Sequence, residues 1–399
     1  MTEILLTIFF ISVLLIFLGS GIWVAISMVG VSSIGMMLFT TRPVGDAMAT
    51  TIWGASSSWT LTALPLFVWM GEILFRTKLS ENLFEGLSPW MQKLPGGLVH
   101  VNVVGCALFA AISGSSAATV ATVGKMSIPE LRKRKYPESI LLGSLAGSGT
   151  LGLLIPPSII LIIYGVTVQE SIAKLFIAGI LPGIMIALIF MTYVMIWSLI
   201  NKKSMPTFKQ DFSLMEKVRK SGKLIPVILL IVSVIGSIYT GIATATEAAS
   251  LGVVGALILS YFQKSLSLRT FKESLLGATK TSCMIAFILA GATFLSLAMG
   301  FTGLPRNLAL WIEGMELSPY VLIFVLMIFY IILGMFLDGI SAVVLTMAII
   351  EPMIRQAGFD MIWFGVFLVI VVEMAQITPP VGFNLFVLQS MADKDIGYI

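Results

Sequence analysis

Small polar residues and paired prolines occur together twice in this chain, within segments that are otherwise apolar. The first set contains Ser113, Gly114, Ser115 and Ser116, followed by Pro156, Pro157 and Ser158. The second contains Asp338, Gly339 and Ser341, followed by Thr378, Pro379, Pro380, Val381 and Asn384. Gly114 precedes Pro156 by 42 residues and Gly339 precedes Pro379 by 40. Because a diproline interrupts the hydrogen bonds of a helix, each set predicts a broken helix with exposed backbone groups.

These residue types are suited to binding ions. Hydroxyl and carbonyl oxygens suit a hard cation such as sodium, and the amides at a helix start suit an anion. Asp338 is the one carboxylate near a predicted break, and a charge at that depth in a membrane marks a functional candidate. The alternative role for Asp338 is to cap the second hairpin helix, and both roles can coexist. One isolated break is most often a plain kink, but duplicated breaks indicate a transporter binding site.

The elements that hold these residues are predicted to be membrane helices. Of the 399 residues, 58% are hydrophobic and 11% are charged, against about 25% charged in a typical soluble domain. The first apolar segment lacks a basic flank and a cleavage site, so we expect it to be retained. The apolar segments, most of them long enough to span a bilayer, are residues 4–39, 59–75, 140–164, 175–200, 224–239, 245–262, 282–299, 321–337 and 361–386.

Basic residues predict the topology. Four connections hold 17 of the 24 Lys and Arg residues and should be cytoplasmic: 76–93, 132–135, 202–223 and 264–272. Residues 97–129 leave and return to this side, which predicts a re-entrant hairpin broken at the serines. Residues 319–355 predict a second hairpin that enters from the opposite side. The basic residues lie at helix ends, so they are a topology signal and no sign of nucleic-acid binding.

The two hairpins predict an inverted repeat within a single membrane domain. Residues 1–200 contain the first hairpin and a broken helix at about 140–165, and residues 224–399 contain the second hairpin and a broken helix at about 361–390. The diprolines correspond at an offset of 223 residues. The second repeat ends one helix early, so a final scaffold helix is expected to be missing; truncation of the chain and true absence of the helix both stay open.

Other ionisable residues have simpler explanations. Glu72 lies four residues before Arg76, as in a surface ion pair. Glu247 lies three residues after Thr244, the spacing of a capping box. Glu373 is a candidate relay without a visible partner, and His100 is expected to be structural.

The sequence lacks the motifs of several functional classes. No phosphate-binding loop of an ATP-driven pump is present, and neither are the G-x-S-x-G or H-E-x-x-H patterns of enzymes, so we expect no catalytic activity. Cys106 and Cys283 lie in apolar segments and form no pair that would bind a metal, so both are expected to be small buried residues. A channel would not need two opposed hairpins, and a membrane scaffold would leave the duplicated breaks without a purpose.

The motifs around both breaks resemble those of one family, the large membrane subunit of tripartite ATP-independent periplasmic (TRAP) transporters (DctM-like), over essentially the whole chain. The matching stretches are residues 113–124, 128–130, 151–158, 239–241, 246–249, 333–338 and 378–386.

The resemblance implies an elevator-type, sodium-coupled secondary transporter in a bacterial inner membrane. It implies two partners, a small membrane subunit (DctQ-like) and a periplasmic substrate-binding protein (DctP-like). The implied substrate is an organic acid, such as a C4-dicarboxylate, a sialic acid or a sugar acid. No cofactor is implied beyond sodium as the coupling ion.

The resemblance also maps site residues. Sodium would be held by Ser113 to Ser116 with Pro156, Pro157 and Ser158, and by Asp338 and Gly339 with Thr378, Pro379 and Pro380. We expect the anion near Ser115, Ser158, Ser341, Val381 and Asn384. The alternative is a stand-alone carboxylate symporter or antiporter that needs no binding protein.

Overall fold

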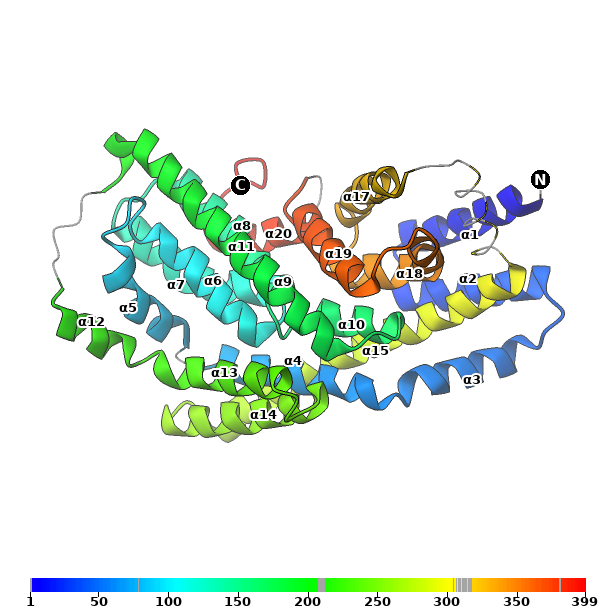
Figure 1. The fold of residues 1–399 in the computed structure, drawn as a ribbon, viewed down its shortest axis with the longest axis horizontal. Helices are drawn as coiled ribbons and strands as arrows, with labels where there is room; N and C mark the ends of the chain where they lie inside the picture. Colours follow the sequence, from blue (N-terminus) through cyan, green and yellow to red (C-terminus); the bar gives the residue numbers. More distant parts are fainter. Residues whose placement is uncertain are drawn as a thin grey trace.

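The computed structural model describes residues 2–77, 79–206, 212–303, 305, 307, 310, 314, 318–379 and 382–399, and within them it contains helices and no strand (Figure 1). The first half comprises α1 (Thr2–Gly19), α2 (Val24–Phe39), α3 (Val44–Ser56), η1 (Trp59–Thr62), α4 (Ala63–Phe75), α5 (Leu79–Met91), α6 (Val99–Ser113), α7 (Ser116–Lys133), α8 (Glu138–Gly149), α9 (Leu151–Leu154), α10 (Ile159–Thr167) and α11 (Ile172–Ile200). The remainder comprises η2 (Lys202–Ser204), α12 (Leu214–Ser221), α13 (Ile225–Tyr239), α14 (Ala245–Phe262), α15 (Leu268–Thr302), α17 (Pro319–Gly334), α18 (Gly339–Gln356), α19 (Met361–Gln376) and α20 (Phe383–Ala392).

The helices have the length and composition of a multi-pass membrane protein. Five spans in the described chain are long and apolar enough to cross a bilayer, and two bent helix pairs bring the number to seven if each pair is one span. In an 18-residue apolar window of α11 only 22% of the residues are buried, and the exposed residues of this helix include Leu181, Leu188 and Ile196. Such a surface fits lipid or a partner subunit.

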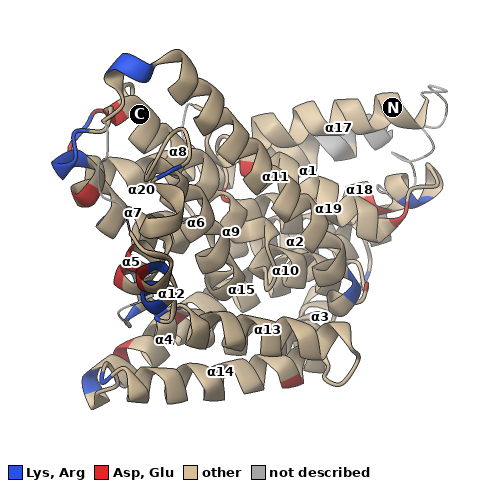
Figure 2. Cartoon of the chain, turned by 60° about the vertical axis from the view of Figure 1, so that its left-hand side comes forward, with Lys and Arg blue, Asp and Glu red and all other residues tan. Residues whose placement is uncertain are grey.

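Charged residues gather mainly at one side of the bundle. Figure 2 shows them around α5, α7 and α12, at the end of α11 and at the turn from α14 to α15, while the central band is almost uncharged. These are the connections that the basic-residue count predicts to be cytoplasmic.

The hairpins and interrupted helices of both halves pack against one another. In the first half α6 and α7 form a hairpin that packs on α8 and α9. In the second half α17 and α18 form a hairpin that packs on α19. The halves meet where α10 packs on α18 and α19, α9 packs on α19, and α20 packs on α7 and α8. The predicted fold class is thereby confirmed: an all-α membrane protein with two hairpins and two discontinuous helices.

A second group of helices flanks this assembly. The 35-residue helix α15 packs along α2, α3 and α4, and α14 packs on α4 and α13 (Figure 1). Small residues allow the close approach: a Cβ at Gly291 of α15 would lie 2.8 Å from the Ala25 carbonyl oxygen of α2. The assignment of residues 1–200 and 224–399 to two inverted repeats stays a prediction.

Some boundaries differ from the sequence expectation. The apolar segment 4–39 is two helices, because the chain turns at Gly21, whose φ is +80°. Helix α15 begins at Leu268, well before residue 282. The apolar pattern did not predict this start, because the first turns of the helix carry charges such as Arg269 and Lys272. Helix α3 was not anticipated. Of the two cysteines, Cys106 is buried and Cys283 is exposed, so the expectation that both are buried is wrong for Cys283.

Candidate functional site

The tip of the first hairpin is a glycine turn followed by a serine cap. Gly114 ends α6 in the left-handed conformation, with φ +59°, which glycine adopts without strain. Ser115 is the N-cap of α7, and its hydroxyl accepts a hydrogen bond from the Ala118 amide at 3.5 Å. Two helix ends therefore meet at the predicted position, with the carbonyl end of α6 beside the amide end of α7.

The serine hydroxyls at this tip already have protein partners. The Ser113 hydroxyl lies 2.9 Å from the Thr119 hydroxyl, and the Ser116 hydroxyl donates to the Thr150 carbonyl at 3.3 Å. Thr119 also donates to the Ser115 carbonyl at 2.8 Å. The polar cluster is thus internally connected, and it joins hairpin to interrupted helix.

The first hairpin tip sits directly on the first diproline break. The Ile159 amide donates to the Gly114 carbonyl at 3.3 Å. A Cβ at Gly114 would lie 2.7 Å from the Pro157 carbonyl oxygen, and one at Gly152 would lie 2.5 Å from the Ser115 carbonyl oxygen. The structure therefore brings together the two segments that the sequence paired, 113–116 and 156–158.

At the break itself the chain turns between α9 and α10. The Pro156-Pro157 peptide bond is cis. Ser158 is the N-cap of α10: its hydroxyl accepts from the Leu161 amide at 3.3 Å and donates to the Leu153 carbonyl. Ser158 is fully buried, so this hydroxyl satisfies one group of each half-helix away from solvent.

Asp338 caps the second hairpin helix, as the alternative reading expected. Its Oδ2 accepts hydrogen bonds from the Ile340 and Ser341 amides, both at 3.1 Å. The neighbouring Gly339 is buried close to the first half: a Cβ there would lie 3.3 Å from Ile160 Cδ1 of α10 and 2.8 Å from Gln376 Nε2 of α19. The capping role leaves the second carboxylate oxygen for other ligands.

The second break is described only in part. Thr378 donates to the Met374 carbonyl at 2.6 Å, Pro379 is exposed, and Gly382 has a φ of +55°. Pro380 and Val381, two predicted site residues, lie outside the described residues.

Two predicted substrate residues are buried with unpaired polar atoms. Both amide atoms of Asn384 and the Ser341 hydroxyl are fully buried and have no hydrogen-bond partner among the described residues. A buried polar group without a partner costs roughly 1–3 kcal/mol, so such groups are usually completed by a ligand, a water or a movement.

Glu373 makes a contact between the two halves that the sequence did not predict. It lies in α19 with 3% of its surface exposed, and its Oε1 accepts a hydrogen bond from the Leu153 amide at 3.2 Å. The carboxylate thus reaches from the second half to the first interrupted helix. The sequence signal was a single acid in an apolar helix, but the partner is 220 positions away and carries no side-chain signature.

The residues predicted to have structural roles, Glu72, Glu247 and His100, have such roles in the structure. Glu72 forms an ion pair with Arg76, and Glu247 forms a capping box with Thr244. His100 is fully buried with Nε2 2.8 Å from the Pro95 carbonyl oxygen, where it ties the start of α6 to the preceding turn.

Two hairpins whose tips meet interrupted helices inside an apolar bundle define a membrane transporter. The solved structure of the YdaH transporter from Alcanivorax borkumensis has the same overall fold, with a TM-score of 0.64 over 96% of this chain and 93% of that one, at 13% identity.

Sequence comparison gives the family. The family model described as "Tripartite ATP-independent periplasmic transporter, DctM component" matches residues 10–399, and the chain belongs to this family. The C4-dicarboxylate TRAP transporter large permease protein DctM of Pseudomonas aeruginosa is 33% identical over 91% of this chain and 84% of its own length. The 2,3-diketo-L-gulonate large permease YiaN of Escherichia coli is 32% identical, over 86% of this chain and 81% of its own length. The isethionate permease DctMQ of Oleidesulfovibrio alaskensis is 30% identical over 96% of this chain, which spans 60% of that protein. The family is one of transporter permeases and not of enzymes.

Proposed function

We propose that this protein is the large permease subunit of a sodium-driven importer of an organic acid. The observation that carries the proposal is that both hairpin tips meet at the start of one helix, α10. Gly114 of the first hairpin bonds to Ile159, and Gly339 of the second lies against Ile160. Helix ends of both signs converge there in an apolar bundle, which is the arrangement that binds a charged substrate and its coupling ion.

The anion would be held at helix starts and by the unpaired polar atoms. The starts of α7 and α10, capped by Ser115 and Ser158, direct further first-turn amides toward the break. The Ser341 amide already donates to Asp338, so Ser341 would contribute its free hydroxyl instead. Asn384, with donor and acceptor both unpaired, would contact the acid directly, and Val381 would complete the site.

Sodium would be held by oxygens on both sides of the anion. In the first half these are the hydroxyls and carbonyls of Ser113, Gly114, Ser115 and Ser116 with Pro156, Pro157 and Ser158. In the second half the free oxygen of Asp338 would act with Gly339, Thr378, Pro379 and Pro380. Sodium binding would neutralise the site and order both hairpins, which favours movement of hairpins and interrupted helices as one elevator body.

The family supports the proposed partners and location. A small membrane subunit and a periplasmic substrate-binding protein would work with this chain in a bacterial inner membrane, and the name DctMQ of one relative combines two of these components. The names of the relatives favour carboxylates and sulfonates as substrates, namely C4-dicarboxylates, 2,3-diketo-L-gulonate and isethionate.

Uptake by proteoliposomes tests the function. The chain is reconstituted with the small subunit and binding protein encoded beside it, and radiolabelled succinate, isethionate and N-acetylneuraminate are offered separately. We expect one acid to accumulate only with an inward sodium gradient and only with the binding protein present. Equal uptake under a potassium gradient contradicts sodium coupling. Uptake without the binding protein supports the stand-alone symporter instead.

Replacing Asp338 by Asn separates its charge from its capping role, because an Asn side chain still caps a helix. We expect the half-saturating sodium concentration for uptake to rise at least fivefold while thermal stability stays within about 1 kcal/mol of wild type. The matched control is Glu72→Gln, which removes a carboxylate that pairs with Arg76 and faces Gly277 of α15. Equal sodium dependence in both variants would remove Asp338 from the sodium site.

A further inference from the structure

Helix α12 is attached to the arm helix α5 by its polar side. The Trp90 indole donates to the Ser221 hydroxyl at 2.8 Å, and that hydroxyl donates to the Gly86 carbonyl at 3.3 Å. Lys223, just after α12, forms an ion pair with Glu85. These contacts fix which face of α12 points toward the protein.

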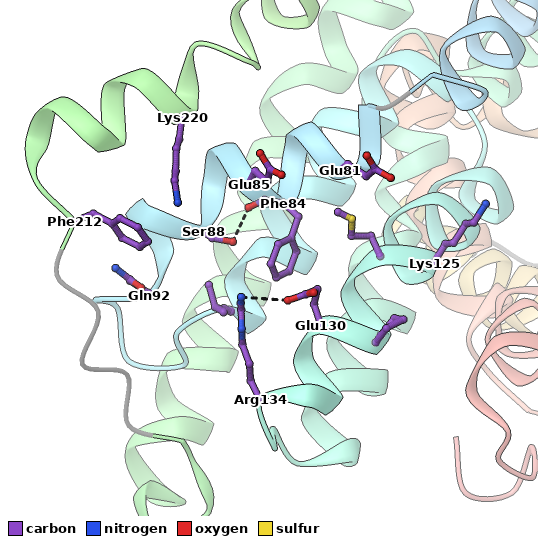
Figure 3. Close-up of a pocket in the computed structure, with 13 residues that line it drawn as sticks. Glu81, Phe84, Glu85, Ser88, Gln92, Lys125, Glu130, Arg134, Phe212 and Lys220 are labelled. Carbon is purple, nitrogen blue, oxygen red and sulfur yellow. Dashed lines mark hydrogen bonds and ion pairs between the residues drawn. The ribbon is translucent and has the colours of Figure 1, made fainter. Parts of the chain in front are cut away.

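Behind α12 lies a polar pocket of about 550 Å³ between α5, α7 and α12 (Figure 3). Lys220 and Phe212 close it on the α12 side, and across from them Glu130 of α7 pairs at 3.1 Å with Arg134, the residue after this helix. The inner face of α12 is therefore polar and faces charged groups of both signs.

The outer face of α12 is apolar and uncovered. Leu214, Met215 and Val218 are 74%, 77% and 59% exposed. At about 100° per residue they lie side by side on one face. Arg219 borders one edge of that face, and at the other edge Ser221, which contacts α5, is followed by Lys217 over the Trp90 ring. Among the described residues Arg219 has no ion-pair partner. This order, a basic residue on each side of an apolar strip, is that of an interfacial helix.

The apolar face continues into a membrane helix. After a bend of 56°, α13 exposes Ile225, Leu229 and Val232 at 55%, 62% and 59%. Helix α13 carries no charged residue and is mainly apolar, so its exposed flank suits lipid, and α12 lies at its predicted cytoplasmic end. Because the two exposed faces are adjacent in the chain, the same leaflet would cover both.

We propose that α12 is an interfacial anchor that binds anionic phospholipid of the cytoplasmic leaflet. Leu214, Met215 and Val218 insert among the acyl chains, and Lys217 and Arg219 extend to the lipid phosphates. Lys217, which lies over the Trp90 ring at 5.3 Å, is held at the level where tryptophan itself prefers the interface. The anchor fixes the arm α5 to the membrane surface through the Trp90–Ser221 contact.

Spin-label depth measurement tests the insertion. In full-length protein carrying Cys283→Ser, with buried Cys106 retained, a nitroxide is placed at Val218→Cys or, as control, at Glu216→Cys on another face. In nanodiscs of phosphatidylcholine with phosphatidylglycerol, we expect the label at 218 to relax mainly with oxygen and the label at 216 mainly with a water-soluble nickel chelate. Equal nickel accessibility at both positions overturns the proposal. Protection of 218 only after the small subunit is added also overturns it, in favour of a protein interface.

A charge variant tests the lipid class. Each basic residue near an anionic surface contributes about 1 kcal/mol, or roughly fivefold in affinity. Lys217→Gln with Arg219→Gln should therefore lower the preference for phosphatidylglycerol over phosphatidylcholine by more than tenfold, as read by native mass spectrometry of retained lipid. The control, Lys264→Gln with Arg269→Gln, removes the same charge at the turn from α14 to α15. Equal losses in the two double variants contradict a specific role for α12.

Discussion

Replacing Gly152 by Ala is expected to lower substrate uptake more than tenfold. The added Cβ would lie 2.5 Å from the Ser115 carbonyl oxygen, 2.6 Å from the Ser115 carbonyl carbon and 2.7 Å from the Ser116 amide nitrogen. All three are backbone atoms, so no side-chain rotation can relieve the contact, and the hairpin tip must move away from the break. Overpacking of this kind costs about 1–3 kcal/mol and displaces the groups proposed to bind substrate. Initial uptake rates in proteoliposomes measure the effect.

The matched control is Gly143→Ala in the preceding helix, α8. A Cβ at Gly143 has no neighbour within 4 Å, and the substitution raises helix propensity. We expect uptake close to wild type and an unchanged or slightly higher melting temperature. If Gly152→Ala transports as well as Gly143→Ala, the contact between hairpin tip and break is not part of the transport site.

Replacing Glu373 by Ala is expected to destabilise the protein by about 1 kcal/mol and to abolish most uptake, because the buried Leu153 amide loses the acceptor from the second half and keeps only the Thr150 carbonyl, at 3.1 Å. Replacing Glu373 by Gln should retain much more of the stability and of the uptake, because the amide oxygen of Gln can still accept that hydrogen bond. If the melting temperature falls from wild type to Glu373→Gln and falls further in Glu373→Ala, the hydrogen bond is the structural role of Glu373. Thermal unfolding in detergent and uptake in proteoliposomes are the two measurements.

Glu351→Ala is the control for Glu373. Glu351 pairs with Arg355 one turn away at 2.9 Å on a partly exposed surface, and such pairs contribute at most about 1 kcal/mol. We expect a small change in melting temperature and normal uptake. If Glu373→Gln is as inactive as Glu373→Ala while remaining stable, the carboxylate has a role in transport beyond this hydrogen bond.

The sequence was sufficient for the features that depend on local chemistry. Diprolines interrupt helices wherever they occur, serine and aspartate cap helices through their own side chains, and apolar length defines spans. For these reasons the break at 156–157, the capping role of Asp338 and both hairpins could be predicted. The capping box of Glu247 and the ion pair of Glu72 are likewise local, since each partner is three or four residues away.

Features that depend on distant contacts could not be predicted in the same way. The Glu373–Leu153 hydrogen bond joins a side chain to a backbone amide in the other half, and any residue type supplies such an amide. Gly152 looked like one more small residue in a membrane helix until its distance from the Ser115 backbone was known. The outer apolar face of α12 was hidden because four basic residues within ten positions, 214–223, dominate the composition of that segment.

The hydrogen bond from Leu153 to Glu373 has a consequence for biosynthesis. The first interrupted helix leaves the ribosome 220 residues before its carboxylate partner. Until α19 has been inserted, the Leu153 amide has only the Thr150 carbonyl as an acceptor, and the first hairpin lacks α20 against α7. The first half therefore enters the bilayer as an incomplete intermediate. Its final packing can be completed only after α19 and α20 have been made.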